Sequence, residues 1–210
     1  MRDPALAAGC AALGLTLPTA ALAALSSYLD LLEKWNRAYN LTAVRERDAM
    51  VTRHLLDSLA VLPHLPASGS FVDVGTGPGL PGIPLAIAAP VHRYCLLDSN
   101  GKKTRFLFQV KTALALANIR IAPARAEDHR PEQPYTGVLS RAFAALPAML
   151  ECCGHLLAPG GAFYAMKAQV AADELAAAEA LGYRATVTAL AVPGLDEQRS
   201  LITLRPETSA

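Results

Sequence analysis

The chain has 210 residues, of which 52% are hydrophobic and 18% are charged, and its formal net charge is +1. This composition is typical of a globular protein and excludes general disorder, and the length suits one buried domain with an extension. Because the net charge is close to zero, a nucleic-acid partner would have to be met by a local basic patch.

Cysteine usage indicates a reducing compartment. The four cysteines, Cys10, Cys95, Cys152 and Cys153, include no C-x-x-C pair, and no histidine lies at zinc-ligand spacing from any of them. Neither a disulfide framework nor a metal site is therefore predicted. We expect a cytoplasmic monomer with reduced thiols.

Residues 5–25 are apolar and alanine-rich, and residues 6–10 resemble a lipoprotein processing box. A signal peptide needs an apolar segment of about 7–15 residues before such a site, whereas only residues 1–5 precede this one. Two glycines and a proline also interrupt the stretch, which makes it a poor membrane span. We expect no membrane partner.

A first helix is predicted from Pro18, because leucines at three- and four-residue spacing lie on one face. Those leucines are Leu22, Leu25, Leu29 and Leu32. Residues 35–45 lose this period and combine aromatic, amide and guanidinium groups, among them Asn40 and Arg45. Such groups stack on bases and hold phosphates, although the stretch also suits a capped helix end with a solvated loop.

A second helix is predicted over residues 46–65, with His54 and Asp57 three positions apart near its middle. This pair is either catalytic or a surface hydrogen bond. Prolines and a glycine then break the chain before residue 71. Residues 1–68 are therefore predicted to be a helical extension packed on a core domain formed by residues 69–210.

The stretch from residue 71 to residue 89 carries the strongest signal in the chain. Residues 71–74 predict a buried strand, the apolar run from Ile83 predicts a helix, and four glycines lie between them. They are Gly75, Gly77, Gly79 and Gly82. Glycines concentrate at the first strand–helix turn of a doubly wound sheet, because the chain turns sharply there and a ligand approaches the main chain.

Two cofactor classes use such a turn. Residues 77–82 formally satisfy the G-x-G-x-x-G fingerprint of dinucleotide binding, which is a weak signal alone. Asp73 discriminates, because a carboxylate there repels a pyrophosphate but suits the cationic amino-acid end of S-adenosylmethionine. Asp98 lies where either cofactor would place its ribose hydroxyls. The methyl donor is favoured over nicotinamide, and a turn without any ligand is the third reading.

Strands and helices continue to alternate after the glycines, as expected of a parallel sheet. Strands are predicted at residues 94–98, 119–122, 138–143 and 162–167, helices at 102–116, 146–157 and 171–181, and a closing antiparallel hairpin at 187–192 and 200–204. Arg141 and Lys167 fall at the carboxyl ends of two strands, the edge where open α/β sheets bind ligands. They are either catalytic cations or partners of Asp98 or Glu127 in salt bridges.

Several motifs together resemble the RsmG (GidB) family of bacterial 16S rRNA guanine-N7 methyltransferases. They are Asn40-Leu41-Thr42-Ala43-Val44, His54-x-x-Asp57-Ser58-Leu59, Asp73 to Gly82, Ser140-Arg141-Ala142 and Lys167. The resemblance implies a Rossmann-like, class I methyltransferase sheet, seven-stranded and mostly parallel with an antiparallel last strand. It also implies S-adenosyl-L-methionine as cofactor, and N7 of guanine 527 in the 16S rRNA of the small ribosomal subunit as target.

The resemblance also implies which residues contact the donor. They are Gly75, Leu80, Ala126, Glu127 and Arg141, with Asp98 on the ribose, and we add Asp73, Gly77 and Gly79 from the glycine turn. Two positions depart from the family pattern: Thr136 stands where an acidic residue is common, and Ala168 where glycine is usual. Neither departure touches the expected donor site.

Guanine N7 already offers a lone pair and has no proton to lose, so the reaction needs no general base. We therefore predict Arg141 and Lys167 as the catalytic residues, holding guanine O6 or a neighbouring phosphate. RNA would bind a patch drawn from Arg37, Asn40, Arg45, Arg53, His54, Lys102, Lys103, Arg105 and Arg199. The basic run at residues 102–111 also suits a solvated helix face.

Two other functions fit the same fold, because fold does not determine substrate. One is methylation of a small molecule or a protein. The other is a non-catalytic, donor-binding module that assists ribosome assembly.

Overall fold

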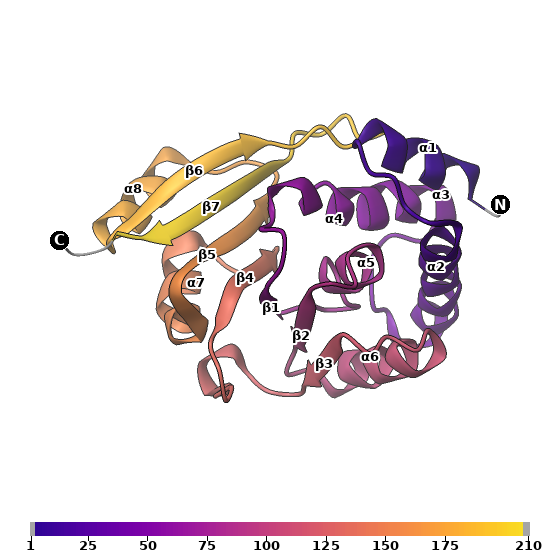
Figure 1. The fold of residues 1–210 in the computed structure, drawn as a ribbon, viewed down its shortest axis with the longest axis horizontal. Helices are drawn as coiled ribbons and strands as arrows, with labels where there is room; N and C mark the ends of the chain where they lie inside the picture. The colour runs from indigo at the N-terminus through magenta and orange to yellow at the C-terminus, as the bar shows by residue number, and fades with distance from the viewer. Residues whose placement is uncertain (1–2, 208–210) are drawn as a thin grey trace.

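The computed structural model describes residues 3–207; residues 1–2 and 208–210, which the two predicted units included, lie outside that range. Within it, the chain forms one sheet of seven strands in the order β3-β2-β1-β4-β5-β7-β6 (Figure 1). The strands are β1 Ser70–Val74, β2 Arg93–Leu97, β3 Ile119–Ala122, β4 Tyr135–Arg141, β5 Leu157–Lys167, β6 Tyr183–Ala189 and β7 Ser200–Pro206.

Strand pairing confirms the expected fold class. β1 pairs in parallel with β2 and β4, β2 with β3, and β4 with β5. β7 runs antiparallel to both of its neighbours, β5 and β6. The result is a Rossmann-like sheet with one antiparallel strand inserted near its end.

Register brings the predicted cations to one edge of the sheet. Arg141 at the end of β4 is level with Met166 of β5, and Lys167 at the end of β5 is level with Ser200 at the start of β7. The carboxyl ends of β4 and β5 therefore meet the beginning of β7. This is the edge at which open α/β sheets bind ligands.

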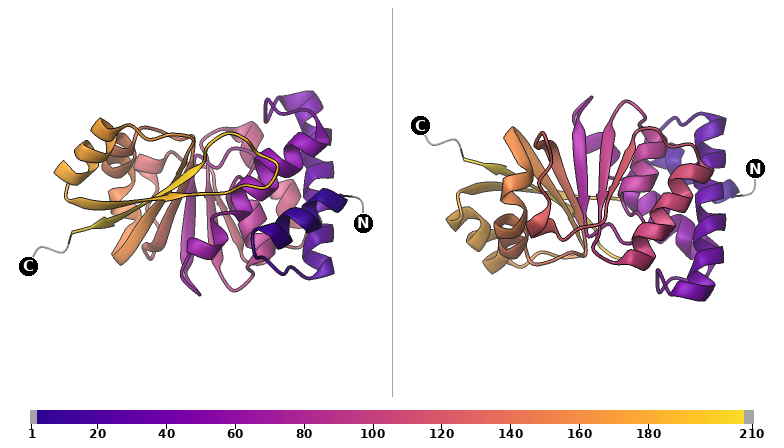
Figure 2. Two further views of the ribbon diagram at one scale, coloured as in Figure 1. Left: turned by 90° about the horizontal axis from the view of Figure 1, so that it is seen from above. Right: turned by 90° about the horizontal axis from the view of Figure 1, so that it is seen from below.

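Helices cover both faces of this sheet (Figure 2). They are α1 Pro4–Ala12, α2 Thr19–Tyr39, α3 Arg47–Met50, α4 Asp57–Leu59, α5 Gly82–Ala88, α6 Gly101–Ala113, α7 Leu146–Cys153 and α8 Ala172–Ala180, with a π-helix η1 Val51–Leu56 and 3₁₀ turns η2 Leu62–His64, η3 Ala126–Asp128 and η4 Gly154–Leu156. Among residues 3–207, no helix combines the length and apolar character that crossing a membrane requires.

The alternation of β1 side chains explains the two layers. Phe71 lies on one face, where it stacks on Tyr94 with ring centroids 5.6 Å apart and shares a core with the N-terminal helices, α5 and α6. Val72 and Val74 lie on the other face, in a second core with α7 and α8. Because every helix before β1 contributes to the first core, the division of the chain at residue 68 stays a prediction.

The N-terminal region differs from the prediction in two places. The alanine-rich stretch forms α1, which the sequence analysis did not anticipate, with Leu6 and Cys10 buried. The helix predicted over residues 46–65 is present, but its central part, η1, is π-helical. A π segment leaves no simple signature in side-chain periodicity, and such segments occur frequently at functional sites.

The closing hairpin is confirmed, but its first strand lies earlier than predicted. β6 covers Tyr183–Ala189, whereas the apolar run at residues 187–192 suggested a later strand. Leu190 and Val192 leave the sheet and are buried in the core that contains the N-terminal helices. Apolar character marked them as buried without indicating which partner buries them. The connection between β6 and β7 therefore reaches across to the helical side of the molecule (Figure 1).

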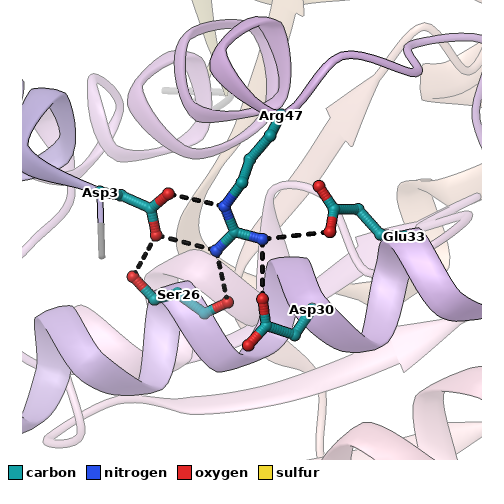
Figure 3. A network of polar contacts seen from close by, with 5 residues as sticks. All are labelled: Asp3, Ser26, Asp30, Glu33 and Arg47. Carbon is teal, nitrogen blue, oxygen red and sulfur yellow. Dashed lines mark hydrogen bonds and ion pairs between the residues drawn. The ribbon is translucent and has the colours of Figure 1, made fainter.

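Arg47 joins the first three helices (Figure 3). Its guanidinium binds Asp3 through two contacts of 2.6 and 2.8 Å, and Nη1 lies 2.7 Å from Asp30 and 3.2 Å from Glu33 of α2. Asp3 is buried and also accepts a hydrogen bond from Ser26. These carboxylates raise the pKa of Arg47 above its usual value, so the network stays charged.

Changing Arg47 to methionine should destabilise the protein by roughly 3 kcal/mol, because it removes two charged hydrogen bonds from the buried Asp3 carboxylate. Urea unfolding measures the decrease in the free energy of unfolding. The matched control is Arg37→Met, which removes an exposed arginine of α2 and should change the free energy of unfolding by less than about 0.5 kcal/mol. Equal effects in the two variants would contradict the structural role assigned to Arg47.

Candidate functional site

The glycine turn between β1 and α5 has the backbone that its composition predicts. Gly75 and Gly77 have φ angles of 64° and 61°, in the left-handed region that side chains disfavour. The turn is tied to the next strand, because the Thr76 amide donates to the Leu97 carbonyl at 3.2 Å. Main-chain groups of this turn are thereby placed at the carboxyl edge of the sheet.

Asp73 lies beneath this turn. Its side chain is fully buried, and one carboxylate oxygen accepts hydrogen bonds from the Thr76 hydroxyl at 2.5 Å and the Gly82 amide at 2.8 Å. Burial raises the pKa of Asp73 to about 7, against the lowering effect of these two donors. The carboxylate thus holds the turn from inside, and its predicted contact with the amino end of the donor stays a prediction.

Asp98 holds the other side of the turn. One of its oxygens accepts from the Gly77 amide at 2.9 Å, and the other accepts from the Asn100 amide at 2.8 Å. The Lys103 ammonium lies 3.6 Å from the same carboxylate. Asp98 therefore connects the ends of β1 and β2, as expected of a residue that binds ribose hydroxyls at this position.

A cavity of about 260 Å³, the loop cavity, opens beside Asp98. It is lined by Gly75, Leu97, Asp98, Ser99, Ala124, Arg125, Ala126, Glu127 and Phe143. Four of the predicted donor contacts are therefore brought together: Gly75, Asp98, Ala126 and Glu127. The others, Asp73, Gly77, Gly79, Leu80 and Arg141, do not line this cavity, and their contact with the donor stays a prediction.

A second cavity, of about 460 Å³, lies at the ends of β4 and β5 and is called here the cationic cavity. It is lined by Val44, Arg53, His54, Asp57, Arg141, Ala142, Met166, Lys167, Ala168, Gln169 and Arg199. Both predicted catalytic residues, Arg141 and Lys167, are in it. Three of the predicted RNA contacts, Arg53, His54 and Arg199, are also in it.

Asp57 organises the cationic cavity. Its two oxygens lie 3.1 Å from Arg141 Nη1 and 3.1 Å from Arg199 Nε, and its side chain is only 5% exposed. Arg141 Nη1 also donates to the Arg53 carbonyl at 3.0 Å. One carboxylate from the N-terminal helices thus orients arginines from β4 and from the residue before β7.

The alternative salt-bridge partners proposed for the two cations, Asp98 and Glu127, are wrong. Arg141 pairs with Asp57, and Lys167 pairs with Glu174 of α8 at 2.6 Å. Asp98 and Glu127 belong to the loop cavity, on the other side of β1. The real partners come from helices whose packing on the sheet edge is not evident from local sequence.

His54 does not form the surface hydrogen bond with Asp57 that their spacing suggested. Both side chains are buried, and the Nε2 atom of His54 lies 2.9 Å from the Thr42 hydroxyl instead. Burial, and the nearby charge of Arg141, lower the pKa of His54 to about 4. The imidazole is therefore neutral at physiological pH, and it can offer RNA a polar wall but no positive charge.

The remaining predicted RNA contacts are outside both cavities. Asn40 ends α2 in the left-handed conformation, with φ of 50°, and its side chain accepts from Arg45 at 2.9 Å. Lys102 and Lys103 are in the first turn of α6, where the Asn100 side chain caps the helix. Their contact with RNA stays a prediction.

Sequence reasoning missed Phe143 as a cavity residue. It was assigned to the strand predicted over residues 138–143, but β4 ends at Arg141. The chain turns at Ala142, whose φ is 52°, and Phe143 then lies against the glycine turn. An aromatic residue after Ser-Arg-Ala was the available signal, and it was taken for a buried strand position.

Residues 21–202 match the family model described as "GidB: rRNA small subunit methyltransferase G". The chain is 52% identical over 200 residues to "Ribosomal RNA small subunit methyltransferase G" of Alkalilimnicola ehrlichii, covering 95% of this chain and 90% of that protein. It is 54% identical to the protein of the same name from Shewanella amazonensis, covering 86% and 87%.

Two solved structures show a similar fold. The "DhpI-SAH complex structure" has a TM-score of 0.59 and 16% identity, covering 90% of this chain and 98% of that one. The precorrin-6y C5,15-methyltransferase of Geobacter metallireducens has a TM-score of 0.57 and 18% identity, covering 81% and 92%. At this identity the likeness shows the fold alone.

The raised pKa of Asp73 makes the stability of the protein pH-dependent. Between the unfolded pKa of about 4 and the folded pKa of about 7, only the native state holds the proton, so rising pH should reduce stability by up to about 1.4 kcal/mol per unit. Asp73→Asn should remove this slope while retaining one acceptor oxygen. Urea unfolding at pH 5, 6, 7 and 8 measures it.

The matched control for this titration is Asp48→Asn, which removes an exposed carboxylate of α3. The difference between wild type and Asp73→Asn should change in favour of the variant as pH rises from 5 to about 7, and should level off by pH 8. A constant difference across the four pH values would contradict the assignment.

Proposed function

Because the chain belongs to the GidB family, rRNA small subunit methyltransferase G, we propose that it transfers a methyl group from S-adenosylmethionine to N7 of one guanine in small-subunit ribosomal RNA. The observation that carries this proposal is the adjacency of the two cavities. One is built from the glycine turn and Asp98, and the other from partly exposed cations that carboxylates orient. We further propose a monomer that acts in the cytoplasm.

The loop cavity fits the donor. At Gly75, a Cβ atom would fall 2.6 Å from Cδ2 of Phe143, so the absent side chain leaves room for that ring at the cavity. The Asp98 carboxylate is positioned by two backbone amides, and its remaining lone pairs suit ribose hydroxyls. When bound, the donor would supply an electrophilic methyl group on a sulfonium centre.

The cationic cavity fits a guanine. Arg141 is restrained by Asp57 and by the Arg53 carbonyl, and Lys167 by Glu174. Cations held in this way can bind guanine O6 or a flanking phosphate without reorganising during the reaction. Because N7 carries no proton, positioning and exclusion of water are the main tasks of the protein. His54, neutral and hydrogen-bonded to Thr42, is not needed as a base.

The experiment that tests the function uses labelled donor with 16S rRNA, or with small subunits from cells that lack their own enzyme. Mass spectrometry of the digested RNA should find one 7-methylguanosine. Calorimetry should show binding of S-adenosylmethionine and S-adenosylhomocysteine. A protein that binds nicotinamide dinucleotides but neither methyl compound would refute the proposal, and a protein that binds donor without turning it over would be a non-catalytic module.

Lys167→Met and Arg141→Lys should each lower kcat for rRNA methylation by about 100-fold, because directed cations at the reacting base are lost. Affinity for S-adenosylhomocysteine should stay within about threefold in Lys167→Met, since Lys167 does not line the loop cavity and is not a predicted donor contact. Arg184→Gln, which changes an exposed arginine of β6, is the matched control. Parallel loss of donor affinity would instead place the two residues in donor binding.

Lys102→Gln and Arg45→Gln should weaken RNA binding and flatten its dependence on salt. Each lost phosphate contact should reduce the slope of log K against log salt concentration by about 0.7 for single-stranded RNA. Filter binding between about 50 and 200 mM salt measures the slope, again with Arg184→Gln as control. A wild-type slope near zero would contradict the proposed RNA patch.

A further inference from the structure

The turn after β4 separates the two cavities. Arg141 and Ala142 line the cationic cavity, whereas the next residue, Phe143, lines the loop cavity. Consecutive residues therefore face different cavities, and Ala142 and Phe143 together form the wall between them. A methyl group that passes from the donor to a base must cross at this wall.

The backbone of the wall is strained in a way that its neighbours stabilise. Ala142 has a φ of 52°, in the left-handed region that residues with a side chain disfavour. Before this residue, Arg141 is held by Asp57; after it, Phe143 contacts the glycine turn. The sharp turn at Ala142 thus directs a cation to one side and an aromatic ring to the other.

Gly75 provides the seat for the Phe143 ring. A Cβ atom at Gly75 would lie 2.6 Å from Cδ2 and 3.3 Å from Cε2 of the ring, so any side chain there would displace it. Phe143 is nevertheless 36% exposed. Part of the ring is thus supported by the glycine turn, and part remains accessible.

We propose that Phe143 is the ring on which the target guanine stacks. This inference rests on the proposed function and names a substrate contact within it. A base that leaves its RNA stack loses stacking energy, and an aromatic side chain replaces part of it. The ring would define the plane of the purine, while Arg141 and Lys167 define its rotation within that plane.

Stacking here also favours the reaction itself. Guanine N7 is neutral before transfer, and the purine carries a positive charge once the new N–CH₃ bond has formed and the S–CH₃ bond has broken, with the sulfonium becoming a neutral thioether. The face of an aromatic ring attracts a cation. Contact with Phe143 therefore becomes stronger as charge develops, and removing the ring should lower kcat more than it raises KM.

Two variants of Phe143 distinguish the contribution of the aromatic ring from that of an apolar side chain alone. Phe143→Leu keeps an apolar side chain without a π face, and Phe143→Tyr keeps the ring. In rRNA methylation, the leucine variant should lose about 10- to 100-fold in kcat, and the tyrosine variant should stay within about threefold of wild type. Because Phe143 also lines the loop cavity, kcat is compared at saturating donor, and the loss of kcat in the leucine variant should exceed any loss of affinity for S-adenosylhomocysteine in calorimetry.

The variant Phe143→Trp tests the stacking by fluorescence, independently of the kinetics. With S-adenosylhomocysteine present, guanosine monophosphate should quench the fluorescence of the new indole, and uridine monophosphate should quench it less. Wild type, whose only tryptophan is Trp35, is the control and should show neither change.

Three results would overturn the inference. They are wild-type kcat in Phe143→Leu, equal losses of donor affinity and rate in that variant, and no quenching in Phe143→Trp. Failure of the wild-type protein to methylate rRNA would refute the proposed function instead, and the quenching experiment would still decide whether a purine stacks at Phe143.

Discussion

The shared carboxylate of Asp57 is the interaction on which the arrangement of this site depends. It is nearly inaccessible to solvent and meets two guanidinium groups, from Arg141 on β4 and Arg199 beside β7. A buried carboxylate is unfavourable unless it is paired, so three segments distant in the sequence are brought to one point. The N-terminal helices are therefore part of the site, and the connection between β6 and β7 closes over it.

Two other carboxylates restrain the main chain at the loop cavity, as Asp57 restrains the two arginines at the cationic cavity. Asp73 holds the glycine turn from beneath, through Thr76 and Gly82, and Asp98 holds it from the side, through Gly77. In both cavities a carboxylate from one element restrains groups of another. The main chain of the turn and the cations beyond it are thus positioned before any ligand arrives, which is the condition for electrostatic preorganisation.

Local signals predicted the sheet and the loop cavity, and failed where distant segments meet. Strand periodicity, the glycines and Asp98 act within one strand–helix unit, so their placement follows from short stretches of sequence. The partner of Arg141 is Asp57, 84 residues away in the sequence. The partner of Lys167 is Glu174, 7 residues away, on the following helix. Spacing on a helix suggested that His54 and Asp57 would contact each other. In the folded protein, the packing of helix on sheet gives each a different partner.

Pairing of the cations also bears on selectivity. Among the described residues at the cationic cavity, Arg53 pairs with Glu197, Lys167 with Glu174, and Arg141 and Arg199 share Asp57. Four cations thus face three carboxylates, and the excess charge is small. Such a small excess charge attracts polyanions only weakly. The cations therefore select a ligand by geometry, because they bind acceptor atoms that lie along the directions of their N–H bonds. General affinity for RNA must then come from exposed residues outside it, and a base is selected only after it reaches the wall formed by Ala142 and Phe143.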